Sequence, residues 1–142
     1  MDLLTRDEYA ALAAGLSVPR AAFIDGKFRK GKGKPLKTVN PATGELIAEI
    51  AACNAADVDF AVGKAREVFD QGHWSRLHPS ERKDMLKHFA KLLHRNRREL
   101  AVMECLDSGK PIRDCKMIDV PETIHTIKWH AEAIDKIYDQ TA

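Results

Sequence analysis

The sequence of 142 residues predicts one α+β domain, with a short helix, a region of β-hairpins and then three or four packed helices. Two tight-turn sequences, Asp25-Gly26 and Asn40-Pro41-Ala42-Thr43-Gly44, lie between short apolar runs, as in hairpins. After Asn54 the apolar residues recur at helical spacing instead. Gly109 and Pro111 then form a stop between two helical segments, because glycine can end a helix and proline cannot continue one.

The first third of the chain contains one helix and two hairpins. Thr5 and Glu8 form a capping-box pattern, which predicts a helix from about Arg6 to Ala14 that ends at Gly15. Residues 22–28 predict a hairpin with a type I′ turn at Asp25-Gly26. Two further strands are expected at residues 36–39 and 46–51, joined by the turn at residues 40–44.

The remaining residues predict helices. Asn54 is a good N-cap for an amphipathic helix that ends before Gly72, and Pro79 starts the next helix. The polar run at residues 94–99 interrupts the apolar stripe of that helix and predicts a kink or break. The last helix is expected to open near Asp119. Its core-facing seam consists of residues spaced three and four apart: Val120, Ile124, Ile127, Ala131, Ile134 and Tyr138.

Composition excludes several classes of protein. No apolar run is long enough to cross a membrane, and the acidic, mixed N-terminus is not a secretory signal. Three cysteines, Cys53, Cys105 and Cys115, form no CxxC pair, so we expect a reduced, cytoplasmic protein. Six cations between residues 27 and 37 would suit a nucleic-acid footprint, but a solvated loop is the favoured interpretation and we expect no nucleic-acid partner.

The chain shows no catalytic motif. It has no glycine-rich loop for phosphates, and its six histidines lack the spacing of a metal site. Cys53 precedes a helix cap and Cys115 adjoins Lys116, yet free cysteine usually serves as a small buried apolar residue. We therefore expect no catalytic and no cofactor-binding residue in this chain. One carboxylate needs a partner, since Asp107 lies beside the carbonyl end of a helix.

Three motifs occur in order: Phe23-Ile24-Asp25-Gly26-Lys27-Phe28, Thr38-Val39-Asn40-Pro41-Ala42-Thr43-Gly44-Glu45, and Leu106-Asp107-Ser108-Gly109-Lys110-Pro111. Together they resemble the N-terminal part of the NAD(P)-dependent aldehyde dehydrogenase superfamily. Residues 127–138 are most similar to the branch that oxidises γ-glutamyl-γ-aminobutyraldehyde and related aminoaldehydes.

The resemblance implies part of the larger α/β Rossmann-like fold. Residues 1–21 would be an N-terminal helix and linker, and residues 22–142 an incomplete cofactor-binding domain. A complete enzyme would use a cysteine thiolate to attack the aldehyde and would pass hydride to NAD or NADP. No such cofactor is expected to bind this chain alone. Its partners would be the remainder of the dehydrogenase or other subunits, and the complete enzyme would be a homo-oligomer.

The resemblance also implies a structural monovalent cation, K⁺ or Na⁺, held by Thr38, Val39 and Asp107. A hard cation suits oxygen ligands such as a carboxylate and peptide carbonyls. The alternative is that Asp107 only caps a turn.

Three hypotheses for the chain follow. The first is an N-terminal portion of an aldehyde dehydrogenase that is inactive alone. The second is a truncated, non-catalytic module that associates with full-length subunits through an uncovered seam at residues 120–138. The third is a small nucleic-acid binder, and the hypotheses are ranked in this order.

Overall fold

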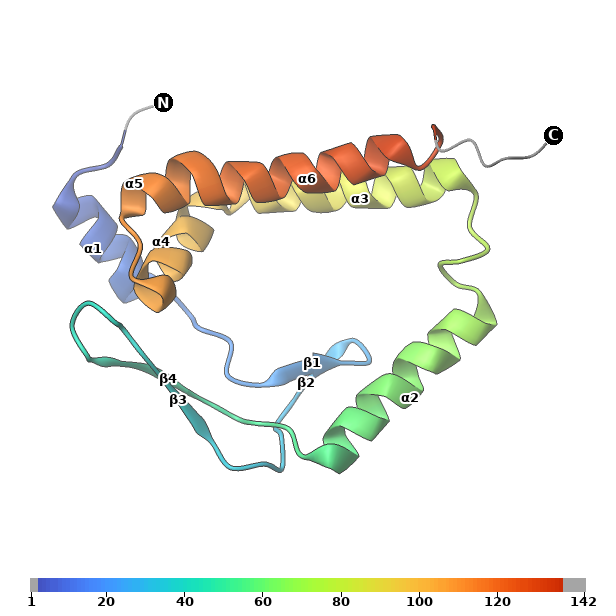
Figure 1. Ribbon diagram of the computed structural model, residues 1–142, viewed down its shortest axis with the longest axis horizontal. Helices are drawn as coiled ribbons and strands as arrows, with labels where there is room; N and C mark the ends of the chain where they lie inside the picture. Colours follow the sequence, from blue (N-terminus) through green and yellow to red (C-terminus); the bar gives the residue numbers. More distant parts are fainter. Residues whose placement is uncertain (1–2, 137–142) are drawn as a thin grey trace. The chain divides into compact units, whose positions relative to one another are not determined.

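The computed structural model describes residues 3–136 and divides the chain into two compact units. One unit contains the chain up to Leu16, Leu77–Cys105, and the chain from Lys110 onward. We call it the helical unit. The other contains Ser17–Arg76 and Leu106–Gly109, and we call it the hairpin unit. Each unit is therefore assembled from segments that are far apart in the sequence (Figure 1).

The hairpin unit contains two separate two-stranded antiparallel sheets. Strands β1 (Ala22–Ile24) and β2 (Lys27–Arg29) pair around Asp25 and Gly26, whose φ angles of 56° and 71° are both left-handed. Positive φ at both central residues confirms the predicted type I′ geometry. Strands β3 (Leu36–Val39) and β4 (Leu46–Ile50) form the second sheet, and their register shifts between Thr38 and Val39.

The basic loop after β2 folds back onto the junction between β4 and the next helix. The Lys32 N–H donates to Asp57 Oδ2 at 2.7 Å, and the Gly33 N–H donates to the Ala52 carbonyl at 2.9 Å. A Cβ atom at Gly31 would lie 2.1 Å from that carbonyl oxygen, so only glycine fits this approach. The loop is thus held by its backbone while its lysines point to solvent.

Helix α2 (Ala55–Gln71) is capped at both ends but buries none of its residues. Asn54 and Asp57 form a capping box at its start, and Gly72 ends it in the left-handed conformation with φ 75°. Its apolar face remains exposed, with Val62 at 62% and Phe69 at 60%. The amphipathic pattern therefore predicted the helix, but the described residues do not cover its apolar face.

The helical unit begins with α1 (Arg6–Gly15), whose Thr5–Glu8 capping box is formed as predicted. Helix α3 (Pro79–Arg95) starts with proline at its first position, and Asn96 separates it from α4 (Arg97–Ser108). This separation confirms the break expected in the polar run. Only the last turn of α4 belongs to the hairpin unit.

The last α-helix starts where it was expected, at Val120 with Asp119 in the N-cap position and Pro121 in the first turn. The helical backbone that precedes it was not expected. Helical structure begins with α5 (Ile112–Asp114), passes through a π-helical turn, η1 (Cys115–Asp119), and continues as α6 (Val120–Ala133). Pro121 suggested a helix start because it has no N–H to donate. The π-helical turn before Pro121 is closed by a hydrogen bond from the Val120 N–H to the Cys115 carbonyl. This wider turn lets the helical backbone continue through the proline.

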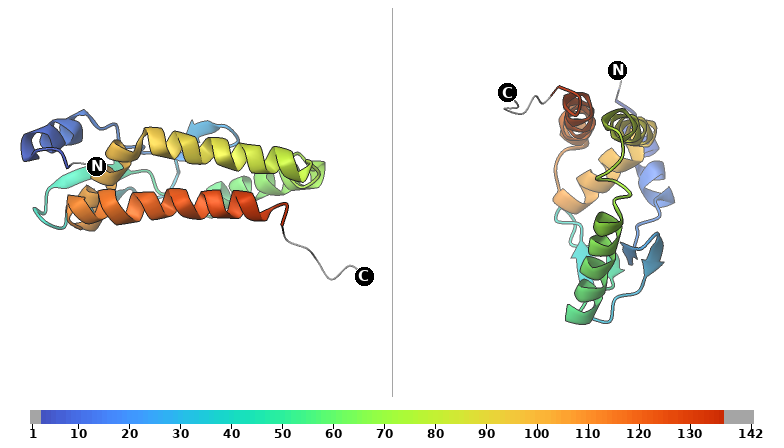
Figure 2. Two further views of the ribbon diagram at one scale, coloured as in Figure 1. Left: turned by 90° about the horizontal axis from the view of Figure 1, so that it is seen from above. Right: turned by 90° about the vertical axis from the view of Figure 1, so that its right-hand side faces the viewer.

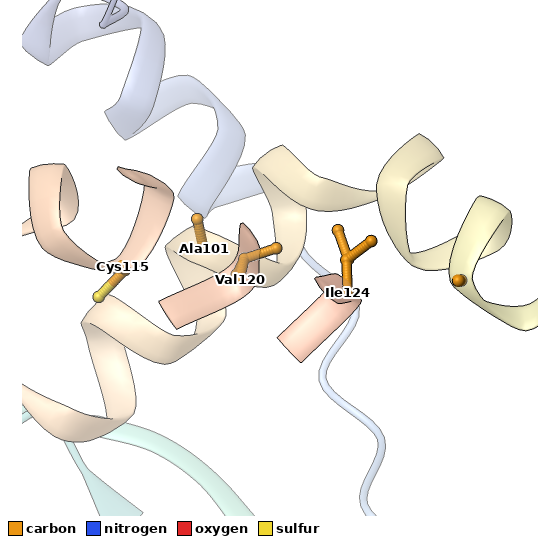
Figure 3. Packing of buried hydrophobic residues seen from close by; sticks show 5 residues of the cluster. Ala101, Cys115, Val120 and Ile124 are labelled. Carbon is orange, nitrogen blue, oxygen red and sulfur yellow. The ribbon is translucent and has the colours of Figure 1, made fainter. Parts of the chain in front are cut away.

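Helices α3 and α6 lie side by side (Figures 1 and 2). The core of the unit is made of small and medium side chains: Ala90, Ala101, Cys115, Val120 and Ile124. Figure 3 labels the last four of them. Ile127 of the predicted α6 seam packs against this cluster and Ala131 is fully buried, whereas Tyr138 lies outside the described residues. The seam is covered by its own unit, so the expectation that it would be uncovered was wrong.

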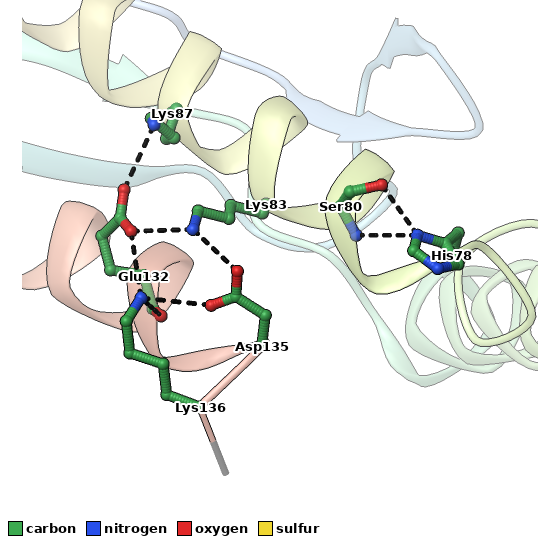
Figure 4. Close-up of polar contacts among 7 residues, drawn as sticks. All are labelled: His78, Ser80, Lys83, Lys87, Glu132, Asp135 and Lys136. Atoms are coloured by element: carbon green, nitrogen blue, oxygen red, sulfur yellow. Dashed lines mark hydrogen bonds and ion pairs between the residues drawn. The ribbon is translucent and has the colours of Figure 1, made fainter.

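Charged side chains also join α3 to α6 (Figure 4). Lys83 Nζ lies 2.8 Å from Glu132 Oε2 and 2.9 Å from Asp135 Oδ2, and its side chain is only 18% exposed. Lys87 contacts Glu132, and Lys136 contacts both carboxylates. Hydrogen bonds from Lys83 are the main reason that the pKa of Glu132 and that of Asp135 both fall to about 2. Within the described residues, no helix is both long and apolar enough to cross a membrane.

These lowered pKa values predict acid sensitivity. The pKa of Glu132 is about 2 in the folded state and ordinarily 4.5, and that of Asp135 is about 2 and ordinarily 3.8. Both carboxylates therefore stabilise the folded state when the pH is above these ordinary pKa values. That contribution is lost as the pH falls from about 5 to about 2. Replacing Lys83 by Met should therefore make the free energy of unfolding depend less steeply on pH across this window, as measured by urea denaturation.

The matched control is Lys34→Met, which removes a loop lysine outside this ion-pair group and should leave the pH dependence unchanged. Identical slopes for Lys83→Met and the unaltered chain would contradict the assigned role of Lys83.

Candidate functional site

The corner that follows α4 contacts the turn between β3 and β4. Gly109 has φ 73°, and a Cβ atom there would lie 2.7 Å from Pro41 Cγ. A side chain at this position would therefore meet both backbone strain and the proline ring. Both partners belong to the hairpin unit.

Asp107 finds its partner at the same corner. The Thr38 hydroxyl donates to Asp107 Oδ1 at 2.6 Å, although the two residues are 69 positions apart in the sequence. A hydroxyl donating to a carboxylate over this distance makes a charge-assisted hydrogen bond. This bond supplies part of the compensation that a negative charge at the carbonyl end of α4 requires. It also connects β3 to the last turn of α4.

The three residues of the expected cation site are brought together in part. Thr38 contacts Asp107 directly, and Val39 is the next residue of β3. The strand register shifts between Thr38 and Val39, so that Ile47 of β4 has no partner on β3 in the ladder. A β-bulge disturbs the ladder of backbone hydrogen bonds and changes the direction of the groups beside it. The register shift therefore lies between Thr38 and Val39, the two residues whose backbone oxygens the family resemblance implies as cation ligands.

The chemistry of this donor set fits a hard monovalent cation. A carboxylate, backed by peptide carbonyls, provides only oxygen ligands. Among residues 3–136, no three His, Cys, Asp or Glu side chains are grouped to hold a metal ion. A cation at this corner would therefore depend on backbone oxygens of Thr38 and Val39 together with the Asp107 carboxylate.

The side-chain bond between Thr38 and Asp107 was not predicted from the sequence. The resemblance pointed to backbone oxygens near Thr38, and no local pattern reports a contact across 69 residues. A hydroxyl near the end of a strand is too common to predict a particular carboxylate partner.

The cysteines and the sheets of residues 3–136 bear on whether this part of the chain could carry out catalysis. Burial raises the pKa of Cys105 and of Cys115, which makes both thiols poor nucleophiles, while Cys53 is exposed. Both sheets in the described part are antiparallel pairs, without the parallel βαβ unit that binds a dinucleotide. The described residues therefore do not fit NAD or NADP.

The family assignment rests on the sequence match as well as on the fold. Residues 28–142 match the aldehyde dehydrogenase family. The chain belongs to this family. It is 57% identical over 142 residues to aminoacetaldehyde dehydrogenase of Pseudomonas aeruginosa, a match that covers 99% of the chain but only 29% of that relative. The chain thus spans less than a third of this relative's length.

Solved structures of aldehyde dehydrogenases share its fold. A γ-glutamyl-γ-aminobutyraldehyde dehydrogenase from Burkholderia cenocepacia has a TM-score of 0.94 at 41% identity, covering 98% of this chain and 28% of that one. The indole-3-acetaldehyde dehydrogenase AldA of P. syringae, in complex with NAD⁺, has a TM-score of 0.94 at 42% identity, covering 99% and 28%. These likenesses confirm the α+β class and the expected family.

The Thr38–Asp107 bond gives a direct test of the corner. Thr38→Val and Asp107→Ala should each lower the free energy of unfolding by about 0.5–1.5 kcal/mol, because each removes one partner of an exposed hydrogen bond. The double variant should cost less than the sum of the two single changes, since both remove the same interaction. Urea denaturation of all four proteins measures the coupling.

Thr38→Ser is the matched control, because it keeps the hydroxyl and should retain most of the stability. Strict additivity of the two single changes would show that the bond contributes nothing in solution.

Proposed function

We propose that this chain is the N-terminal portion of an NAD(P)-dependent aldehyde dehydrogenase that oxidises an aminoaldehyde to the carboxylic acid. The observation that carries the proposal is the 57% identity to an aminoacetaldehyde dehydrogenase along the whole chain. The fold shared with a γ-glutamyl-γ-aminobutyraldehyde dehydrogenase supports the same class of substrate, since both names contain an amino-substituted aldehyde.

In this proposal the chain supplies part of the scaffold and the chemistry is carried out elsewhere. Residues 22–142 would form the first part of the cofactor-binding domain, preceded by a helix and linker in residues 1–21. NAD or NADP would bind only to the complete enzyme, a cytoplasmic homo-oligomer. The exposed apolar face of α2, with Val62 and Phe69, supports a segment built to pack against further protein.

A chimera tests the proposal. This chain would replace the matching segment of the Pseudomonas aeruginosa aminoacetaldehyde dehydrogenase. The chimera should form NADH or NADPH in the presence of an aminoaldehyde, with kcat/KM within about tenfold of the parent enzyme. The reason is that the exchanged segment contributes scaffold and no reacting group. The 142-residue chain alone should show no turnover with either cofactor.

Two controls make the result decisive. The parent enzyme without its matching segment should be inactive, and size-exclusion chromatography should show whether the chimera assembles like the parent. An assembled chimera without aldehyde oxidation would contradict the proposal, as would reproducible turnover by the chain alone.

We also propose that the corner of the hairpin unit contributes to a monovalent cation site in the complete enzyme. The ligands from this chain would be the Asp107 carboxylate and the backbone oxygens of Thr38 and Val39. The short bond from the Thr38 hydroxyl to Asp107 supports the proposal, because it holds the carboxylate beside those peptides. Such a cation would bind the folded state and stabilise it by mass action.

The active chimera provides the measurement. Its melting temperature should be higher in KCl or NaCl than in tetramethylammonium chloride at equal ionic strength, and Asp107→Ala should abolish the difference. Thr38→Val should melt at a lower temperature yet keep the cation dependence, because the backbone oxygen remains. Equal melting shifts for Asp107→Ala and the unaltered chimera would return Asp107 to the role of a turn cap.

A further inference from the structure

A basic cavity lies in the hairpin unit, between the loop that follows β2 and the start of α2. Its volume is about 340 Å³. Three cations line it, Arg29, Lys30 and Lys32, and Asp57 is the one acid among the described residues of its wall. The cavity therefore gathers part of the positive charge of this loop around one point of the surface.

The wall that carries these cations is fixed by its backbone. The Lys32 N–H donates to Asp57 Oδ2 at 2.7 Å, and the Gly33 N–H donates to the Ala52 carbonyl at 2.9 Å. Gly31 passes so close to the same carbonyl that no Cβ atom would fit there. A wall that is already in place loses little conformational entropy when a ligand binds.

The carboxylate in the wall is already bonded to the backbone. Asp57 Oδ2 accepts hydrogen bonds from the N–H groups of Lys32 and Asn54, the second at 3.0 Å. These two bonds hold the pKa of Asp57 below its ordinary value. The carboxylate therefore stays charged, but it serves to attach the loop to α2 and leaves the cations in excess.

The cations themselves have few partners. The Arg29 guanidinium lies 4.8 Å from the centre of the Phe60 ring and forms an exposed ion pair of 4.0 Å with Asp25. Such exposed pairs are weak and can be exchanged for a ligand. Within residues 3–136, Lys30 and Lys32 form no ion pair, so both ammonium groups remain available.

We propose that the basic cavity binds a small phosphate-bearing anion, and that a diphosphate fits it best. Guanidinium and ammonium groups form charge-assisted hydrogen bonds with phosphate oxygens. Two linked phosphoryl groups give the three cations separate oxygens to contact. Small-ligand sites have volumes from about 300 Å³ upward, so a compact molecule suits this cavity better than a polymer. This binding does not depend on the aldehyde oxidation proposed above.

Cys53 provides a reporter inside the same cavity. It lines the wall and is exposed, so that a small reagent can reach its thiol. Burial raises the pKa of Cys105 and of Cys115, which slows the alkylation of both. A bound anion would cover Cys53 and slow its reaction selectively.

The experiment measures alkylation of Cys53 in the full chain by iodoacetamide, a neutral reagent, with inorganic pyrophosphate as the probe. Peptide mass spectrometry gives the rate at Cys53 itself. Saturating pyrophosphate should slow this rate severalfold, and added NaCl should weaken the effect because it screens exposed charges. The double variant Lys30→Met with Lys32→Met should bind pyrophosphate about tenfold more weakly, since two charge-assisted contacts are lost.

The matched control is Lys27→Met with Lys34→Met, which removes two cations of the same segment that are not part of the described wall. It has the same net charge as the first double variant, yet it should bind pyrophosphate within about twofold of the unaltered chain. Circular dichroism checks that both double variants are folded.

A single-stranded oligonucleotide and vesicles that contain phosphatidylglycerol are tested beside pyrophosphate, because both also carry phosphate groups. The proposal requires that pyrophosphate protect Cys53. Three results would each overturn it: unchanged alkylation in pyrophosphate, equal weakening by the two double variants, or protection by the oligonucleotide or the vesicles without protection by pyrophosphate.

Discussion

The close approach of α3 and α6 is the constraint on which the helical unit depends. Ala90 of α3 and Ala131 of α6 are completely buried, as is Ala101 of α4. Because alanine side chains are small, the helix backbones can come near each other and pack without leaving empty space between them. This proximity is also what allows Lys83 to reach Glu132 on α6 and Asp135 just after its end. A larger residue at Ala90 would force the helices apart and weaken packing and ion pairs together.

Local features of the fold could be predicted from the sequence because their causes lie within a few residues. The capping boxes at Thr5 and Asn54 and the turn at Asp25-Gly26 each depend on neighbouring side chains or on backbone conformation alone. The π-helical turn that precedes the last helix could not be predicted in this way. Pro121 has the local properties of a first-turn residue, but the π-turn before it is stabilised by packing of Cys115 in the core.

Burial was harder to predict than secondary structure. The pattern of α2 correctly indicated an amphipathic helix, yet no residue of α2 is buried. Periodicity identifies the face that can be buried, and only the surrounding protein decides whether it is. The candidate cation site was equally hard to predict from local sequence, because the hydrogen bond between Thr38 and Asp107 joins two distant parts of the chain.

The contact between Thr38 and Asp107 also has a consequence for the order in which the protein folds. Joining two residues 69 positions apart costs the entropy of closing a long loop, and no local interaction offsets that cost in advance. The intervening chain includes α3 and the first part of α4, which belong to the helical unit. During synthesis, β3 and β4 emerge long before Asp107 does. The hairpin unit therefore acquires its last segment only after most of α4 has been made, which gives it a high contact order and a slow final step.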